Sequence, residues 1–426
     1  MRALPLLLAA LLLAAPVVAG VAPDQPSAAP ADASRVDDGD GARQQSAPDD
    51  ATQVPVLSHP AGAAVRSDIG RHGANLGPAS DLEVSATTAA METASVVSHV
   101  ESAETNDERI SRLIEAESGL QQDELALHSR QRSAIQAHAA GELTDEELVV
   151  ELVRISAAAE ALDRRRVELE ALAEETEDFS LSTAELQLRL GVYSGPVREL
   201  ATEALRGEVS ADRIYVASGD STVVLSAVVD GQYVREVYRG DRWDRGASGF
   251  GDGSTEAINA TAQAYGDVLD GQSASTLESN TIVRVDTPLT EDRGRVRTYV
   301  SSGEGGVFVE HQYRPLDSFA DAEAVSVTQD GYNLTVNRTY PGGPVRVSVV
   351  DVEEGEPAAG VTVTVAGDGA ESEEVGTTNE DGVLWTLSPS EPYQVTAVEE
   401  PRVARISGIE PTDTPRTEGN TSSGVE

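Results

Sequence analysis

The chain has 426 residues and a formal net charge of −42, with 73 Asp and Glu residues against 31 basic residues, all of them arginine. So acidic a chain lacks the clustered cations that nucleic-acid binding requires. Cysteine is absent, which excludes disulfides, thiolate metal sites and thiol nucleophiles.

The acidity indicates adaptation to brine. Self-repulsion of this size works against a compact state at ordinary salt, whereas molar salt screens it over a few ångströms. Aromatic content is only 4%, so the cores must rely on Val, Ala and Leu. We therefore expect a halophilic protein of several domains, taking roughly 150 residues per domain as a guide.

Residues 1–22 have the pattern of a secretory signal peptide. Arg2 supplies the basic start, residues 3–18 form an apolar run, and small residues surround Gly20. The run is shorter than the roughly 20 residues of a membrane-spanning helix. We expect an extracellular or cell-surface protein. The alternative is an uncleaved signal, which would be the only means of membrane attachment.

Residues 23–80 are rich in Ala, Pro, Ser and Asp and contain few large apolar residues. A segment of this composition cannot bury enough apolar surface to fold on its own. The sequence therefore predicts a disordered acidic linker.

Residues 81–178 predict a helical hairpin of the coiled-coil type. In the second half, a seam with alternating spacings of four and three runs through Leu148, Leu152, Ile155, Ala159, Leu162, Arg166, Leu169 and Ala173. Gly141 ends the first helix, and Thr144 with Glu147 forms a capping box for the second.

The first helix of this hairpin has a one-sided seam. Apolar residues recur every seven positions, at Leu113, Leu120, Leu127 and Ala134, whereas the other seam positions include Glu117, Glu124 and Gln131. A hairpin of this kind is a spacer, or a surface for self-association or for a protein partner.

Residues 180–318 predict a duplicated α+β domain, each half a helix followed by three strands. The expected helices are 183–206 and 255–269; the expected strands are 213–218, 222–229, 233–239, 281–286, 296–301 and 307–314. The third strands share a pattern, because Gly231-x-Tyr233-Val234-x-x-x-Tyr238-Arg239 matches Gly306-x-Phe308-Val309-x-x-x-Tyr313-Arg314. We expect each half to be an antiparallel sheet with a helix on one face.

Residues 322–404 predict an all-β sandwich, because short Val- and Thr-rich strands alternate with Gly, Pro, Asp and Asn turns. The strand at 345–351, the turn and strand at 355–365, the tight turn at 376–382 and the strand at 393–397 resemble the carboxypeptidase regulatory-like domains, which are transthyretin-like modules. The resemblance implies a seven-stranded sandwich with a structural or adhesive role. Residues 405–426 predict a disordered tail.

The chain as a whole resembles the uncharacterised secreted proteins of haloarchaea. The features that carry this resemblance are the export signal, the lysine-free acidic composition and the terminal sandwich. The resemblance implies no known activity.

We assign no catalytic, cofactor-binding or metal-ligating residue from the sequence, and we expect no cofactor. The six histidines form no His-Glu-x-x-His motif and no close pair. The sequence around Ser248 is not a nucleophile elbow, because Phe250 replaces the final glycine. The glycine loop at 249–253 has no P-loop lysine and lies among aspartates, so we interpret it as a linker.

Two kinds of surface site are predicted. Four sequons mark candidate glycosylation sites at Asn333, Asn337, Asn420 and Asn259. Trp243 lies in a loop after the first repeat, where an exposed tryptophan would mark a binding patch. The alternative is that Trp243 closes the core at the end of its sheet.

These observations favour a non-enzymatic, exported or cell-surface protein of a halophile with a structural, adhesive or binding role. An alternative is a regulator or inhibitor of an extracellular enzyme, because helix-plus-three-strand repeats resemble protease-associated PepSY-type modules at the level of the fold. A third hypothesis is a hydrolase with a carboxylate pair, which requires two facing acids in a cleft.

Overall fold

The computed structural model describes residues 43–44, 53–209, 212–270, 273–303, 306–367 and 371–417. All of them lie in one compact unit that spans residues 42–426. The predicted signal peptide, most of the predicted linker before residue 53 and the sequon at Asn420 lie outside the described residues.

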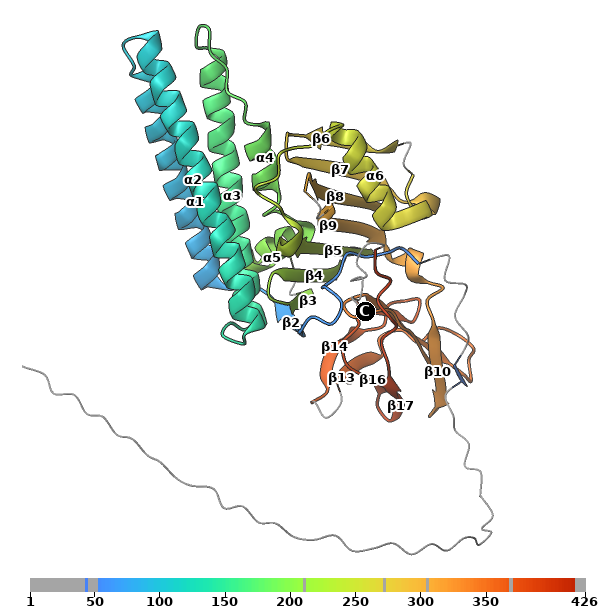
Figure 1. Ribbon diagram of the computed structural model, residues 1–426. Helices are drawn as coiled ribbons and strands as arrows, with labels where there is room; N and C mark the ends of the chain where they lie inside the picture. Colours follow the sequence, from blue (N-terminus) through green and yellow to red (C-terminus); the bar gives the residue numbers. More distant parts are fainter. Residues whose placement is uncertain are drawn as a thin grey trace, which may run out of the picture. The chain divides into compact units, whose positions relative to one another are not determined.

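Three long helices form a layer on one side of the molecule (Figure 1). They are α1 (Leu76–Glu101), α2 (Asn106–Ala139) and α3 (Asp145–Glu174). The predicted capping box at the start of α3 is confirmed, since Thr144 and Glu147 bond each other's backbone N–H groups. The expected first helix is interrupted at 102–105, where Thr105 caps α2 by accepting a hydrogen bond from the Glu108 N–H. The region therefore holds three long helices in place of the expected two.

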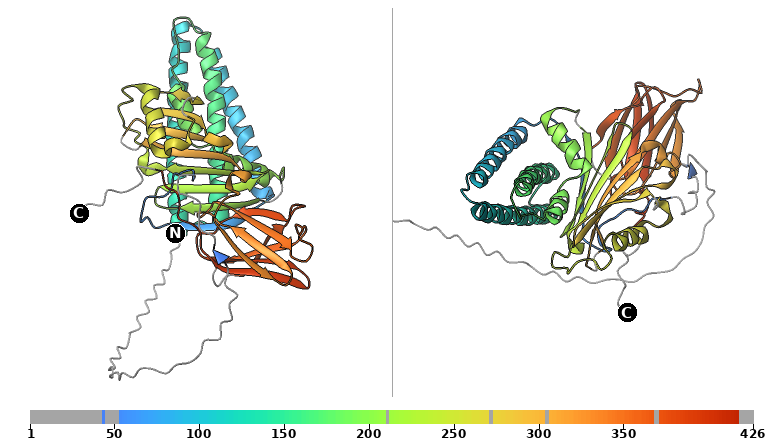
Figure 2. Two further views of the ribbon diagram at one scale, coloured as in Figure 1. Left: turned by 90° about the vertical axis from the view of Figure 1, so that its right-hand side faces the viewer. Right: turned by 90° about the horizontal axis from the view of Figure 1, so that it is seen from above.

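The central helix of this layer is α3, which packs against α1, α2 and the elements that lead to the sheet (Figure 2). All eight of its predicted seam residues are buried. On α2 the predicted apolar residues are buried as well, and so are the polar seam residues Glu124 and Gln131. These two polar positions therefore face into the structure, whereas the third, Glu117, is only half-buried.

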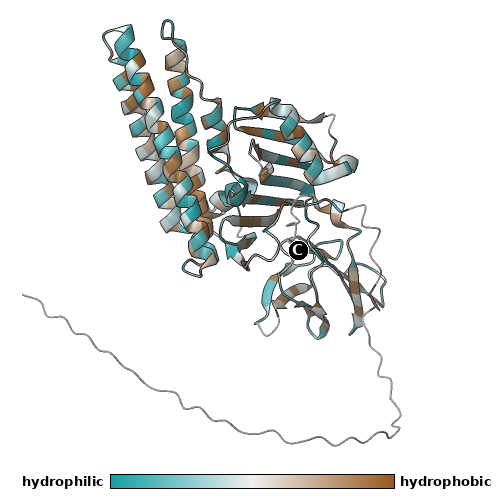
Figure 3. Ribbon diagram, viewed as in Figure 1, coloured by the Kyte–Doolittle hydropathy of each residue, from teal (hydrophilic) through white to brown (hydrophobic). Residues whose placement is uncertain are grey.

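A single antiparallel sheet of eight strands follows, in the order β2-β3-β4-β5-β9-β8-β7-β6. Its strands are β2 (Arg66–His72), β3 (Asp212–Ser218), β4 (Thr222–Val229), β5 (Gln232–Arg239), β6 (Ser275–Glu278), β7 (Ile282–Pro288), β8 (Arg295–Ser301) and β9 (Gly306–Pro315). All six strands expected between residues 213 and 314 are present. In the hydropathy view, hydrophobic and hydrophilic segments alternate along the helices and across this sheet (Figure 3).

The two predicted halves join through β5 and β9 into one sheet and do not form two separate ones. Glu236 lies directly opposite His311, and these positions are equivalent in the repeated pattern. The neighbour of His311, Glu310, points to the other face of the sheet because side chains alternate along a strand.

The helices of the two halves lie on opposite faces of this sheet. The expected helix at 183–206 is two helices, α4 (Ala184–Gly191) and α5 (Pro196–Arg206), and α5 is held by Glu236. The helix of the second half, α6 (Gly253–Tyr265), is held by Glu310 through Tyr265. The two helices therefore cover opposite faces of the joined sheet, so the two halves are not exact repeats of each other.

The C-terminal region is an all-β sandwich, as expected. Its sheets have the orders β1-β10-β11-β12-β15 and β14-β13-β16-β17. The strands are β1 (Arg43–Gln44), β10 (Ala324–Gln329), β11 (Tyr332–Asn337), β12 (Pro344–Asp351), β13 (Thr362–Gly367), β14 (Glu373–Thr377), β15 (Val383–Leu387), β16 (Tyr393–Glu399) and β17 (Arg402–Ile409). The sandwich packs on the eight-stranded sheet, where Ser226 Oγ and Tyr233 OH donate hydrogen bonds to Gly342 O over 2.6 and 3.0 Å.

Both chain ends enter the structure further than the sequence predicts. Residues 53–80, assigned to the linker, include strand β2 and a segment at 54–59 that we call the strap. The strap residues Val56 and Leu57 are both 0% exposed. Residues 405–417, assigned to the disordered tail, complete β17 and then pair with the strap, since Val56 N donates to Pro415 O over 2.7 Å. The apolar residues of the strap are buried against the eight-stranded sheet, whereas Ile406 and Ile409 are buried in the core of the sandwich.

Candidate functional site

Three glutamates are buried at the contacts between the layers. Glu124 of α2, Glu236 of β5 and Glu310 of β9 are 1%, 4% and 0% exposed. An ionised carboxylate inside a protein costs several kcal/mol unless it is paired and hydrogen-bonded. Each of these three accepts hydrogen bonds from an arginine and from donors on other elements, and together they form the principal polar site of the described residues.

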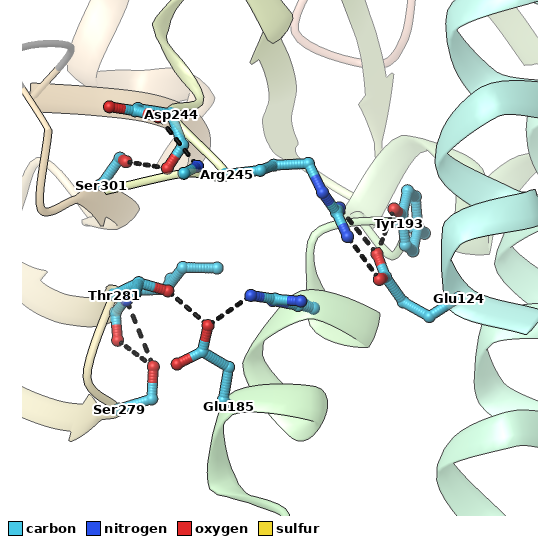
Figure 4. A network of polar contacts seen from close by, with 11 residues as sticks. Glu124, Glu185, Tyr193, Asp244, Arg245, Ser279, Thr281 and Ser301 are labelled. Carbon is cyan, nitrogen blue, oxygen red and sulfur yellow. Dashed lines mark hydrogen bonds and ion pairs between the residues drawn. The ribbon is translucent and has the colours of Figure 1, made fainter. Parts of the chain in front are cut away.

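Glu124 joins the helical layer to two loops of the sheet region (Figure 4). Arg245 makes a bidentate pair, with Nη1 donating to Oε1 over 2.9 Å and Nη2 to Oε2 over 2.6 Å. Tyr193 OH donates to Oε1 over 2.7 Å. Burial raises the pKa of Glu124, but the hydrogen bonds and charge of Arg245 and the Tyr193 hydroxyl outweigh it, so this pKa lies below its usual value.

Trp243 lies beside this pair in the core and not on the surface. It is 8% exposed, and its indole stacks on Phe308 with ring centroids 5.2 Å apart. His128 of α2 meets the indole edge-on at 5.1 Å, and the Arg245 guanidinium lies 4.6 Å from the ring centroid. The prediction of an exposed binding patch at Trp243 is therefore wrong, and the alternative, that it closes the core of its sheet, matches the structure.

A second link appears in the same view. Glu185 of α4 accepts from Arg189 Nη2 over 2.6 Å and from Thr281 Oγ1 over 2.5 Å, and Thr281 immediately precedes β7 (Figure 4). The helix α4 is thus fixed to the far half of the sheet by a partly exposed carboxylate.

Glu236 caps the N-terminus of α5. Its Oε2 accepts from Val197 N over 3.2 Å and from Arg198 N over 3.4 Å, while Arg198 Nε donates to Oε1 over 2.7 Å. The residue at the N-cap position, Gly195, has no side chain to do this. A negative charge at this end of a helix also interacts favourably with the helix dipole.

Arg198 extends this contact to the helical layer. Its Nη1 donates to Gln131 Oε1 of α2 over 2.9 Å and to Tyr193 O over 2.7 Å. Gln131, which interrupts the predicted seam, is 0% exposed. Gln131 is therefore linked to the sheet through Arg198 of α5, which itself pairs with Glu236 of β5.

Glu310 holds three segments together on the opposite face. Its Oε1 accepts from Arg235, and its Oε2 accepts from Tyr265 of α6 and, over 2.7 Å, from the backbone N–H of Leu57 in the strap. Burial outweighs the attraction of Arg235 here, so the pKa of Glu310 is raised.

A Ser-His-Asp arrangement, which the sequence does not reveal, joins the α2–α3 turn to β3. His138 Nδ1 lies 2.6 Å from Ser218 Oγ, and His138 Nε2 lies 2.6 Å from Asp145 Oδ1. A hydrolase uses the opposite ring nitrogens and needs a serine that substrate can reach. Ser218 and His138 are both 0% exposed. The arrangement is suited to fixing the turn, which Arg66 of β2 also holds by donating to Leu143 O over 2.8 Å.

Two concave surfaces are open to solvent. One, of about 690 Å³, lies where α1 and α2 diverge over α3 and is lined by residues such as Arg130, Glu147 and Arg154. The other, of about 590 Å³, lies between the β2–β3 edge and the sandwich, with Tyr215 and Ser390 among its lining residues. Its rim carries several acids, and Glu373 is paired with Arg213 over 2.8 Å.

The three described sequons differ in accessibility. Asn333 on β11 and Asn259 on α6 are exposed. Asn337 is 8% exposed, and its Nδ2 donates to Ala320 O and Ala322 O over 3.2 and 2.9 Å. The amide of Asn337 is therefore engaged in the folded chain, and this sequon is a poor glycosylation site once folding is complete.

Within the residues that the structure describes, no three His, Asp or Glu side chains come together in a way that would hold a metal ion. None of the helices placed in these ranges combines the length and hydropathy of a bilayer span.

Three family models match successive parts of the chain. Residues 323–405 match an archaeal fibronectin-III type-like domain, which agrees with the observed β-sandwich. Residues 1–210 match a domain of unknown function (DUF7096), and residues 214–320 match a family of unknown function (DUF7094). No curated protein and no solved structure matches the chain.

These matches also show how the regions interlock. Strand β2 lies in the first matched region, whereas its partner β3 lies almost entirely in the second. The eight-stranded sheet is therefore built from both regions, and neither has a complete sheet alone. The region at residues 323–405 is similar to an archaeal fibronectin-III type-like domain, while the likeness to carboxypeptidase regulatory-like modules stays a prediction.

Proposed function

We propose that this chain is an exported, salt-adapted protein of a halophilic archaeon with a structural or adhesive role, in which the sheet holds the helical layer and the sandwich in a fixed arrangement. The observation that carries the proposal is the common pattern of Glu124, Glu236 and Glu310. Each buried carboxylate has both oxygens occupied, and each ties together elements that are distant in sequence. Their charge serves to join parts of the molecule.

Such contacts suit molar salt. Salt screens exposed charges strongly and buried pairs much less, so the repulsion of the acidic surface weakens while the internal pairs remain. Arginine is also the cation best matched to a carboxylate by planar, bidentate geometry. A molecule built in this way keeps its parts in place in brine, which a surface or matrix component requires.

Several finer features belong to the same proposal. The match to an archaeal fibronectin-III type-like domain supports an archaeal source, and the charge supports a saline habitat. The signal-like residues 1–22 support export. Asn333 and Asn259 are exposed in sequons and are the glycosylation sites that we favour. Helices α2 and α3 are antiparallel, but the apolar residues of their predicted seam are already buried within the chain. We therefore assign self-association to the exposed side of α1.

The alternative, a regulator of an extracellular enzyme, has one observation in its favour. Strand β2 lies at the edge of the eight-stranded sheet and forms a wall of the cleft of about 590 Å³. An extended peptide adds readily to an open sheet edge. A partner enzyme would therefore be expected to insert a loop along β2.

The test is affinity purification of the tagged full chain from the native cell envelope and the medium, kept in molar salt and followed by mass spectrometry. Recovery with surface components, or as the chain alone, supports the structural role. A stoichiometric extracellular enzyme would move the assignment to the regulator. Turnover of polymer substrates by the purified chain, or labelling of Ser218 by a fluorophosphonate, would contradict both. The same data identify the mature N-terminus and any modified Asn.

A further inference from the structure

The outer face of α1 carries the most exposed large hydrophobic side chains of the described residues. Leu76, Val84 and Met91 are 87%, 66% and 65% exposed, and every other large hydrophobic side chain in these ranges is exposed by 52% or less. Soluble proteins tolerate scattered exposed apolar residues, but a line of them on one element marks a contact surface.

Val84 and Met91 lie on one line along the helix, and Leu76 lies on the same side, roughly 60–80° further around the axis. Leu82 and Val100 are buried against the rest of the layer, and they define the inner side of α1. At 100° per residue, Val84 and Met91 lie on the side opposite to Leu82. With 26 residues and a rise of 1.5 Å, α1 presents this side over about 39 Å.

This outer side is also free of charge. We call it the neutral stripe, and all ten of its members are exposed: Leu76, Gly77, Ser80, Val84, Thr87, Thr88, Met91, Ala94, Ser95 and Ser98. The acids of α1 flank the stripe, at Asp81, Glu83, Glu92 and Glu101. A stripe of this length without a carboxylate stands out on a chain that carries about one net negative charge per ten residues.

The charge distribution of the chain indicates which partner would bind the neutral stripe. A basic partner would be attracted to the carboxylates that cover most of the surface, and the neutral stripe offers it nothing. A second copy of this chain carries the same net charge of −42, so it approaches closely only where both surfaces are neutral. A two-fold contact brings the same patch of each copy together.

We propose that two copies of this chain pair through the neutral stripes of their α1 helices. The small residues at Gly77, Ser80 and Ala94 let the helices approach closely, while Val84 and Met91 supply apolar contact across the axis. The inference draws on the proposed structural role only for the purpose that a dimer would serve. The predicted self-association surface was the seam of the hairpin; the surface proposed here is the exposed side of α1.

The pairing is expected to be weak and to strengthen with salt. One helix on each side buries less than the roughly 1,200 Å² of a standard interface, so we expect a Kd above about 1 µM. Salt screens the flanking carboxylates and, for kosmotropic anions, strengthens apolar contacts. Dissociation on dilution into low salt, with the helical signal retained, is therefore expected.

The first experiment is sedimentation equilibrium of the full chain in molar salt over a range of concentrations. We expect a monomer–dimer equilibrium for the wild type, and at least about a tenfold rise in Kd for V84E and for M91E. The matched control is V352E, which places the same charge at a residue of the sandwich that is 50% exposed. Because these side chains are at least half exposed, we expect each variant to fold. Circular dichroism checks that it does.

The second experiment uses the absence of cysteine. Single substitutions S80C, T87C, M91C and S95C give the chain its only thiol, so any disulfide joins two copies. Oxidation is expected to yield a dimer from at least one of these stripe variants and none from V352C.

Three results would overturn the proposal: a monomer at every concentration, a dimer that V84E and M91E leave unchanged, or a monomer that binds neutral lipid vesicles through α1. None of these outcomes bears on the proposed structural role, which the affinity purification tests separately.

Discussion

Gly195 and Glu236 are so close that a Cβ atom on Gly195 would lie 1.9 Å from Glu236 Oε2. The backbone of Gly195 is extended, with φ −174°, so glycine is needed here for space and not for an unusual backbone angle. Because Gly195 has no side chain, Glu236 of β5 can reach the first N–H groups of α5 and cap this helix.

We expect G195A to destabilise the chain by about 2–4 kcal/mol, because the methyl group must displace a carboxylate that caps α5 and pairs with Arg198. Chemical denaturation in molar salt measures the change. The matched control is G119A on α2, where an added Cβ meets no atom within 4 Å. That variant is expected to be neutral or to gain up to about 1 kcal/mol from helix propensity. Equal effects at the two sites would contradict the capping role.

Replacing Glu124 by Gln is expected to cost about 3 kcal/mol, because Arg245 then remains partly buried without its counter-ion. The double variant E124Q/R245Q should lose less than the sum of the two single variants, which a double-mutant cycle quantifies. E115Q, at an exposed position of the same helix, should stay within about 0.5 kcal/mol of the wild type. Additive losses would show that the pair is not coupled.

Stability is expected to fall as the pH drops from about 6.5 towards 3. Burial and the charges of Arg297, Arg198 and Arg284 lower the pKa of His311 to about 3. The unfolded chain therefore binds a proton at His311 in this window and the folded chain does not, so each pH unit costs up to about 1.4 kcal/mol.

Three further groups, one histidine and two carboxylates, shape the same profile. His59 has a pKa lowered to about 3 and acts in the same direction, and the lowered pKa of Glu124 adds a loss of stability at still lower pH. The raised pKa of Glu310 works the opposite way, because its charged form is disfavoured in the folded state. Unfolding free energies measured against pH should show a shallower slope for H311Q than for the wild type. Identical slopes for H311Q and the wild type would refute this account.

Ending the chain after Glu410 is expected to loosen the strap. The truncation removes the Val56–Pro415 hydrogen bond and Arg416, which donates to Ser58 Oγ and His59 O over 3.1 and 2.7 Å. Limited proteolysis in molar salt should then cut near residues 53–60 at least about tenfold faster, since cleavage follows local opening. R416Q in the full chain should give an intermediate rate. A cut at an unchanged rate would show that the sheet alone holds the strap.

Local patterns predicted much of the fold. A short run of Val, Leu and Ala placed β4 at its observed bounds, and the Thr144–Glu147 box placed the start of α3. These predictions succeeded because strand composition and helix capping depend on residues close in sequence. The turn between α1 and α2 contains neither Gly nor Pro and was missed, although Thr105 and Glu108 have the spacing of a capping box.

The candidate site was largely beyond sequence reasoning. Glu124 and Gln131 were visible as polar interruptions of a seam, but their partners lie 121 and 67 residues away. The Ser218–His138–Asp145 contact joins residues up to 80 positions apart and follows no motif. The strap was interpreted as part of the linker because Val56 and Leu57 are too few to form a core of their own. They are buried only because the strap packs against the rest of the fold.

The pairing of the strap with residues 415–417 ties together segments that are 358 positions apart. Such a set of sequence-distant contacts closes only after nearly the whole intervening chain is available, so it cannot form early during synthesis. The strap therefore becomes buried only once residues 415–417 are available, so the contact that secures the finished molecule is also one of the last to form.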